Sequence, residues 1–161
     1  MARMIAFMAT WTTYGTWLQG SKKGYVKNGI TYDANSELEK SNRESLKQNA
    51  IKIPKNLRII IKNAILKEAE EMSQKVHAIT VCSNHVHIVV GSISKSCGYS
   101  VGRFKKAATK ALRRYGFIDK VWTKGFDKRY CYDEQELEKK IRYVQQHEDK
   151  NFSPLHRRGF N

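Results

Sequence analysis

The sequence predicts one α/β domain of the α+β class, in which strand-like and helical segments alternate along the chain. Two observations carry this prediction: short β-branched runs have the length of strands, and apolar residues elsewhere recur at helical spacing. A chain of 161 residues that is 40% hydrophobic can bury one core, and is short for two. We therefore expect a single domain over 1–161, with a polar insertion at about 21–53 and a basic tail at about 151–161.

The first predicted strand is Met4–Thr13, an apolar, aromatic and β-branched run that is typical of a central strand. Val76–Cys82 and His85–Val90 predict two more strands. Ser83 and Asn84 lie at their junction, and turn chemistry leaves open whether the two strands form a tight hairpin or one long bent strand. Two shorter strands are expected further along the chain, over Val121–Thr123 and Lys128–Tyr132.

Helices are predicted in three places. Proline suits the first turn of a helix, so Pro54 opens the first one, which runs to about residue 74 with an apolar stripe on one side. The second covers Gly98–Tyr115. The third begins after Asp133, which with the glutamate three residues later resembles a capping box, and it runs to about Lys150.

The charge balance points to a polyanionic partner. Lysine and arginine number 30 against 15 aspartates and glutamates, which gives a net charge of +15. An excess this large in a small domain favours nucleic acid over a merely soluble basic surface. No run approaches the roughly 20 apolar residues of a membrane span, so we expect no membrane partner and a cytoplasmic protein.

Three cysteines, Cys82, Cys97 and Cys131, are odd in number and lack CxxC spacing. In a cytoplasmic protein this pattern indicates reduced thiols, and neither zinc ligands nor a disulfide framework. We expect no catalytic role for them.

The helix over Gly98–Tyr115 carries the densest group of cations in the chain. A solvated helix face is the plain explanation of such a group. Several cations on one element with aromatic neighbours also suit contacts to the DNA backbone, and we favour that interpretation. The predicted DNA-binding residues are Arg103, Lys105, Lys106, Lys110, Arg113 and Arg114.

Two histidines lie two residues apart in a strand-like segment. Because a strand alternates its side chains between faces, His85 and His87 point to one side while Val86 and Ile88 point to the other. Imidazole is a common ligand of divalent metals, and a pair fixed by strand geometry needs only one or two further ligands. The pair is therefore a candidate metal site.

The third helix supplies partners for this pair. Tyr143 and His147 are four residues apart on a helix, so they share a face and can reach one point. A tyrosine one turn before a metal ligand suits phosphoryl transfer, in which a metal polarises the phosphate while the phenol oxygen attacks. A phenol has a pKa of about 10, so a cation or base must favour its deprotonation.

These residues carry a family resemblance. Asn84-His85-Val86-His87 is similar to the HUH motif of the single-tyrosine transposases, and Arg142 to His147 is similar to their catalytic helix. The order of elements also matches, including a Thr-Tyr-Gly-Thr-Trp loop after the first strand and a Trp-x-x-Gly-Phe segment before the last helix. The chain looks closest to the branch associated with repetitive extragenic palindromes (REP).

The resemblance implies a ferredoxin-like HUH sandwich, an antiparallel sheet with helices packed on one side, and a Mg²⁺- or Mn²⁺-dependent nuclease for single-stranded DNA. By position, His85 and His87 would bind the metal, and His147 stands where relatives usually carry Gln or Asn as the third ligand. Tyr143 would attack the phosphate, giving a 5′-phosphotyrosine intermediate and a free 3′-hydroxyl. Attack by another 3′-hydroxyl would then join strands.

The implied partner is single-stranded or hairpin DNA in the bacterial nucleoid. A homodimer fits the resemblance, with the active site completed within one chain or by the tyrosine helix of a partner. Each residue also has a plainer explanation: the histidines as ordinary sheet residues, and Tyr143 as a core aromatic. The alternative function is a domesticated, noncleaving nucleic-acid-binding module.

Overall fold

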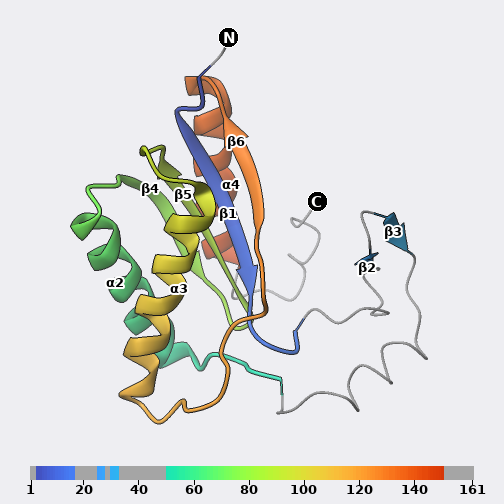
Figure 1. Ribbon diagram of the computed structural model, residues 1–161, viewed down its shortest axis with the longest axis vertical. Coiled ribbons are helices and arrows are strands. Elements are labelled where there is room, and N and C mark those ends of the chain that lie inside the picture. The colour runs from blue at the N-terminus through green and yellow to red at the C-terminus, as the bar shows by residue number, and fades with distance from the viewer. Residues whose placement is uncertain (1–2, 17–24, 28–29, 33–49, 151–161) are drawn as a thin grey trace.

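The main sheet has four antiparallel strands in the order β4-β5-β1-β6 (Figure 1). The computed structural model describes residues 3–16, 25–27, 30–32 and 50–150. The strands of the main sheet are β1 (Ala6–Thr12), β4 (Val76–Val81), β5 (His85–Gly91) and β6 (Asp127–Cys131), and the helices are α2 (Lys55–Glu71), α3 (Cys97–Arg113) and α4 (Glu134–Lys150). A separate two-stranded sheet consists of β2 (Tyr25–Lys27) and β3 (Ile30–Tyr32).

The connectivity of the main sheet is β-α-β-β-α-β, followed by α4. β1 and β4 are joined through α2 and are separated in the sheet by β5, which is the split crossover of the ferredoxin-like fold. The predicted α+β class and ferredoxin-like sandwich are therefore confirmed. Among the described residues, no helix has both the length and the apolar composition that a membrane span needs.

Helices cover both faces of the sheet. α2 and α3 pack side by side on one face, and α4 lies behind the sheet on the other (Figure 1). The expectation that all helices share one side is wrong for α4. The physical reason is that β1 and β5 carry apolar side chains on both faces, and the α4 residues Leu137 and Val144 cover the second apolar face, around Ala6, Met8 and Val89.

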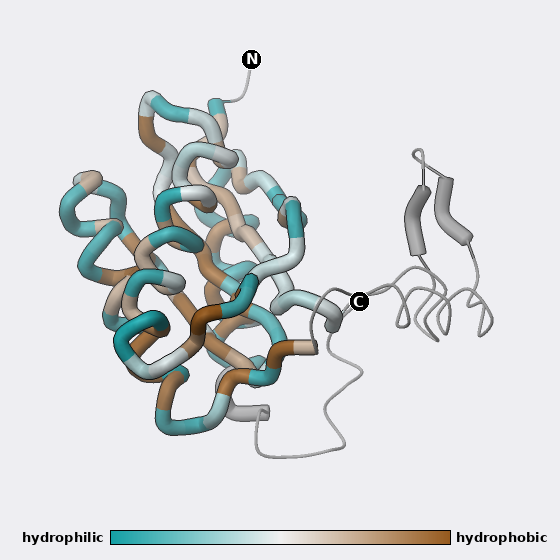
Figure 2. The backbone as a smooth tube through the Cα atoms, turned by 60° about the horizontal axis from the view of Figure 1, so that its bottom comes forward, coloured by the Kyte–Doolittle hydropathy of each residue, from teal (hydrophilic) through white to brown (hydrophobic). Residues whose placement is uncertain are grey.

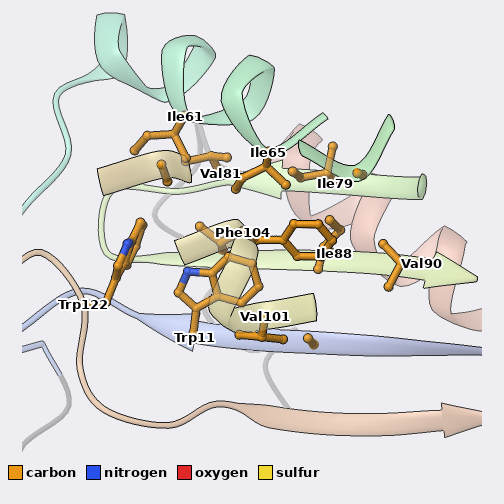
Figure 3. Packing of buried hydrophobic residues seen from close by; sticks show 14 of the residues in the cluster. Trp11, Ile61, Ile65, Ile79, Val81, Ile88, Val90, Val101, Phe104 and Trp122 are labelled. Atoms are coloured by element: carbon orange, nitrogen blue, oxygen red, sulfur yellow. The ribbon is translucent and has the colours of Figure 1, made fainter. Parts of the chain in front are cut away.

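The larger core lies between the sheet and the α2–α3 layer. Phe104 of α3 is fully buried there, as are Ile61 and Ile65 of α2 and Trp11 and Ile88 of the sheet (Figure 3). Along the helical turns, hydrophilic and hydrophobic segments alternate, as expected for helices with one buried side (Figure 2). The apolar stripes predicted for the helices therefore correspond to packed faces.

A tight hairpin joins β4 and β5, which settles the question that turn chemistry left open. The Cys82 backbone N–H donates to the His85 carbonyl at 2.8 Å, so that Ser83 and Asn84 form a two-residue loop. The loop is held from outside, because the Ile53 N–H donates to the Ser83 carbonyl at 2.7 Å. Ile53 is 1% exposed and belongs to the larger core, although it closes the stretch expected to be a polar insertion.

The predicted strand over Val121–Thr123 is wrong, and the predicted insertion and tail lie mostly outside the described residues. Val121–Thr123 forms no regular strand; it makes only an isolated bridge between Trp122 and Thr13 before the chain turns at Gly125, whose φ is +90°. Most of the predicted insertion at 21–53 and all of the predicted tail at 151–161 lie outside the described residues.

Candidate active site

The two histidines of β5 point toward α4. β5 alternates as predicted, with Val86, Ile88 and Val90 in the larger core and Val89 in the smaller core beneath α4. By the period of two, His85 and His87 lie on the same face as Val89. Both are buried, with exposed fractions of 8% and 1%. The strand therefore presents two adjacent imidazoles to the inner side of a helix.

α4 brings Tyr143 and His147 over these imidazoles. The Asp133 carboxylate accepts the Glu136 N–H at 2.8 Å and fixes the start of the helix, as the predicted capping box requires. Leu137 and Val144 then anchor it on the sheet. Since Tyr143 and His147 are one helical turn apart, this anchoring places both of them against β5 in the same chain.

The four rings form one cluster. The His87 ring centroid lies 4.8 Å from that of His85, 4.5 Å from that of His147 and 5.5 Å from that of Tyr143. The Nε2 atoms of His85 and His147 are 2.9 Å apart. All four residues that the sequence analysis assigned to catalysis and metal binding thus come together in one place.

Polar neighbours hold the two histidines of β5. The His85 Nδ1 lies 2.7 Å from the Asn84 amide oxygen, which accepts, and this contact leaves Nε2 directed toward His147. The Thr10 hydroxyl of β1 is 2.7 Å from the His87 Nδ1. Such bonds to the second nitrogen orient an imidazole for metal binding.

His87 is a neutral imidazole at physiological pH. Burial, and then the nearby His85 and His147, lower its pKa to about 2. A neutral ring is the form that binds a metal. The pKa of the Tyr143 phenol is raised, mainly by burial, although the charge of Arg129 acts in the opposite direction.

The depressed pKa of His87 predicts loss of stability on acidification. Below about pH 6.5 the unfolded chain binds a proton at this residue while the folded chain does not, so folding stability falls by up to about 1.4 kcal/mol per pH unit. Urea unfolding at pH 7.5, 6.5 and 5.5 should show this slope, and His87→Asn, whose amide can still bond Thr10, should reduce it. Equal slopes for the two proteins would contradict the prediction.

The donor set fits a metal ion. The Nε2 atoms of His85 and His147 converge to 2.9 Å, and two nitrogen ligands about 2.1 Å from one ion in tetrahedral geometry lie about 3.4 Å apart. His87 flanks the same point. The chemistry of these donors suits a borderline or soft divalent cation better than a hard one.

Cys82, which the cysteine pattern was interpreted to exclude as a metal ligand, lies at the site. Its sulfur and the nitrogens of His85 and His147 all lie within 4.8 Å of one another. Cys82, Cys97 and Cys131 are all buried free thiols in the structure. The sequence does not show that β4 and β5 form a tight hairpin. Because they do, Cys82 stands opposite His85 and shares its face of the sheet.

A cavity of about 640 Å³ adjoins the cluster. α4 lies mainly over β4 and β5, which leaves the same face of β1 and β6 open beside Tyr143. The cavity is bounded by residues from β1, β5, β6, α4 and the loop before β6. They include Thr10, Thr12, His87, Phe126, Asp127 and Tyr143, together with four cations, Lys124, Arg129, Lys139 and Lys140. A cationic hollow beside a phenol suits a phosphodiester chain.

α3, which carries the cations predicted to bind DNA, packs with α2 on the opposite face of the sheet from α4. Some of these cations make contacts within the fold. Arg103 pairs with Glu68, and the Lys105 ammonium donates to the carbonyls of Thr123 and Gly125 at 3.0 and 2.7 Å. Lys105 therefore fastens the loop that borders the cavity. A role of this helix in DNA binding stays a prediction.

A comparison with solved structures agrees with this arrangement of sheet and helices. The chain is similar to a REP-associated tyrosine transposase in a structure bound to a REP hairpin, with a TM-score of 0.57 at 10% identity over 93% of this chain and 70% of that one. This likeness shows that the chain has the fold of that transposase. A putative transposase from Deinococcus radiodurans R1 is 11% identical, with a TM-score of 0.48 over 91% of this chain and 92% of that one. No protein-family model and no curated protein matches the sequence.

Proposed function

We propose that the chain is a metal-dependent endonuclease and strand transferase for single-stranded DNA, of the single-tyrosine HUH type. The observation that carries the proposal is the convergence of Tyr143 with three imidazoles, brought from β5 and α4 to one point. A protein that only binds nucleic acid needs no such cluster. The transposase-like fold supports the same conclusion.

The proposed roles follow from the side chains present, since imidazoles bind metals and a phenol can act as a nucleophile. His85, His87 and His147 would hold a divalent cation, Mg²⁺ or Mn²⁺ on the family resemblance. When bound, the cation supplies Lewis-acid polarisation of the scissile phosphate. The Tyr143 oxygen attacks the phosphorus, the bond to the 3′ oxygen breaks, and the departing oxygen takes up a proton as a 3′-hydroxyl.

The product of this step is a 5′-phosphotyrosine, which keeps the energy of the phosphodiester bond. Attack by another 3′-hydroxyl reverses the step and joins strands, with no external energy source. Since burial raises the pKa of Tyr143, its phenol is protonated in the resting protein, and loss of that proton accompanies the attack.

The cationic cavity is the proposed DNA path at the reacting phosphate. Lys124, Arg129, Lys139 and Lys140 would contact phosphates on either side of the bond that breaks. A hairpin is the proposed recognition element, by analogy with the transposase bound to a REP hairpin. Tyr143 and the three histidines come together within one chain, which supports a proposed site in cis.

The test is a covalent adduct. The protein is incubated with Mg²⁺ or Mn²⁺ and labelled single-stranded DNA from the flanks of its own gene, and a denaturant-resistant protein–DNA species is sought. We expect such a species, and we expect its loss in His85→Ala. Binding without any adduct, across metals and flanking strands, would instead identify a noncleaving binding module.

The position of Arg129 in the cavity wall predicts that this residue contributes to the rate of adduct formation. Arg129→Gln removes a cation beside both the phosphate and the phenol, so adduct formation at saturating DNA should slow by at least about tenfold. The matched control is Arg114→Gln at the C-cap of α3, the helix on the opposite face of the sheet from α4. It should change at most the DNA affinity, with a salt slope reduced by about 0.7 per lost phosphate contact, and leave the adduct rate unchanged. Equal adduct rates for the two variants would contradict the assignment of the cavity.

A further inference from the structure

Cys82 is placed as a ligand would be. It ends the β4 side of the hairpin and stands opposite His85, with its N–H bonded to the His85 carbonyl at 2.8 Å. Residues directly opposite in an antiparallel pair share a face, so the thiol points to the same side as the histidines. It is 3% exposed, which places a sulfur donor inside the cluster and away from solvent.

Three donors converge from two distant parts of the chain. The Cys82 sulfur and one nitrogen each of His85 and His147 lie within 4.8 Å of one another. A zinc ion about 2.3 Å from sulfur and about 2.1 Å from nitrogen in tetrahedral geometry separates those two atoms by about 3.6 Å. A small side-chain movement therefore closes this group around one ion.

We propose that Cys82 takes the ligand position that the resemblance gives to His87, so that Cys82, His85 and His147 form a three-ligand site for a thiophilic divalent cation, with Zn²⁺ as its best match. The proposal rests on the proposed function, in that it names the metal of the same site. Three protein ligands leave a fourth position open, which is the arrangement of catalytic rather than structural zinc. On binding, the Cys82 thiol releases its proton to solvent and binds as a thiolate.

The sulfur and nitrogen donors of the site favour some divalent metals over others. Mg²⁺ requires oxygen ligands in near-octahedral geometry, and it has no affinity for a thiolate. A site with one sulfur and two nitrogens therefore selects Zn²⁺ or Co²⁺ over Mg²⁺. This differs from the Mg²⁺ or Mn²⁺ that the family resemblance implies, and the difference comes from Cys82 together with His147.

The experiment is a titration of the purified full chain with Co²⁺, followed by absorption spectroscopy. We expect a near-ultraviolet thiolate-to-cobalt charge-transfer band that saturates at one equivalent and is lost when Zn²⁺ is added. Cys82→Ser should lack the band and bind Zn²⁺ about 100-fold more weakly or worse, since even an outer-shell partner of a metal ligand is worth about 10- to 100-fold.

The matched control is Cys131→Ser, because Cys131 is also buried beneath α4 but lies outside the donor group. It should keep the band. Circular dichroism shows whether each variant is folded, and the band in the unaltered protein tests the proposal even if Cys82→Ser unfolds. Absence of the band there, or equal Zn²⁺ affinity in folded Cys82→Ser, would overturn the proposal.

The adduct assay, combined with the cobalt titration, distinguishes failure of the thiolate site from failure of the proposed endonuclease activity. A charge-transfer band without any adduct would support the thiolate site and refute the endonuclease. An adduct with Mg²⁺ in a protein that shows no band would refute the thiolate site and support the endonuclease.

Discussion

Replacement of Tyr143 by phenylalanine is expected to abolish covalent adduct formation while leaving DNA bound. The phenol oxygen is the atom that would form the bond to phosphorus, and the phenylalanine ring preserves the packing against His87, whose centroid is 5.5 Å away. Loss of a covalent nucleophile reduces rates by about 10⁴-fold or more. The measurement is the amount of denaturant-resistant adduct over time, with DNA affinity determined in parallel.

Tyr132→Phe is the matched control for this experiment. Tyr132 is 44% exposed and lies outside the ring cluster, just before α4. It should form adduct at the rate of the unaltered protein. Adduct formation by Tyr143→Phe at a normal rate would mean that another residue attacks, and the assigned role of Tyr143 would then be wrong.

Replacement of Phe104 by alanine is expected to lower the free energy of unfolding by about 3–5 kcal/mol. Phe104 is fully buried between α3 and the sheet, among Ile65, Ile88 and Trp11 (Figure 3). The loss combines the transfer free energy of the ring with the cavity that rigid neighbours leave behind. Because domains are stable by only about 5–15 kcal/mol, this single change removes a large part of the total.

Urea unfolding measures this effect, and Tyr115→Ala is its control. Tyr115 follows α3 and is 56% exposed, so its truncation should cost less than about 1 kcal/mol. Similar losses for the two variants would show that Phe104 is not part of a tightly packed core.

Periodicity in the sequence predicted most of the elements. The alternation in β5 assigned His85 and His87 to one face, and the apolar positions of α4 assigned Leu137 and Val144 to the buried side. Both patterns indicate which face of an element is buried, because an apolar side chain on the solvent-exposed face loses the free energy of burial. The arrangement of the histidines and Tyr143 was predictable for the same reason.

The side of the sheet on which each helix packs was not predictable from these patterns. A helix stripe states that one side is buried, but not against which face of the sheet. α4 was therefore placed with α2 and α3, and the cations of α3 were placed near the DNA path without knowledge of their distance from Tyr143. Arg129 and Lys140 come together only through the pairing of β1 with β6 and the packing of α4.

Cys82 was missed for a related reason. Its position depends on whether β4 and β5 form a hairpin, and Ser83-Asn84 is not among the residue pairs that specify a two-residue turn strongly. The loop is held by the Ile53 and Thr13 backbones, which donate to the Ser83 and Asn84 carbonyls at 2.7 and 2.9 Å. Such tertiary bonds leave no local signal in the sequence.

α4 follows β6 in the chain, and it brings both Tyr143 and His147 to a sheet whose four strands precede it. A polypeptide leaving the ribosome therefore has all four strands of the main sheet before it has the phenol that is proposed to attack DNA. On the proposed mechanism, a product of premature termination before Glu134 cannot nick a chromosome. It also leaves Ala6, Met8 and Val89 without the cover of Leu137 and Val144.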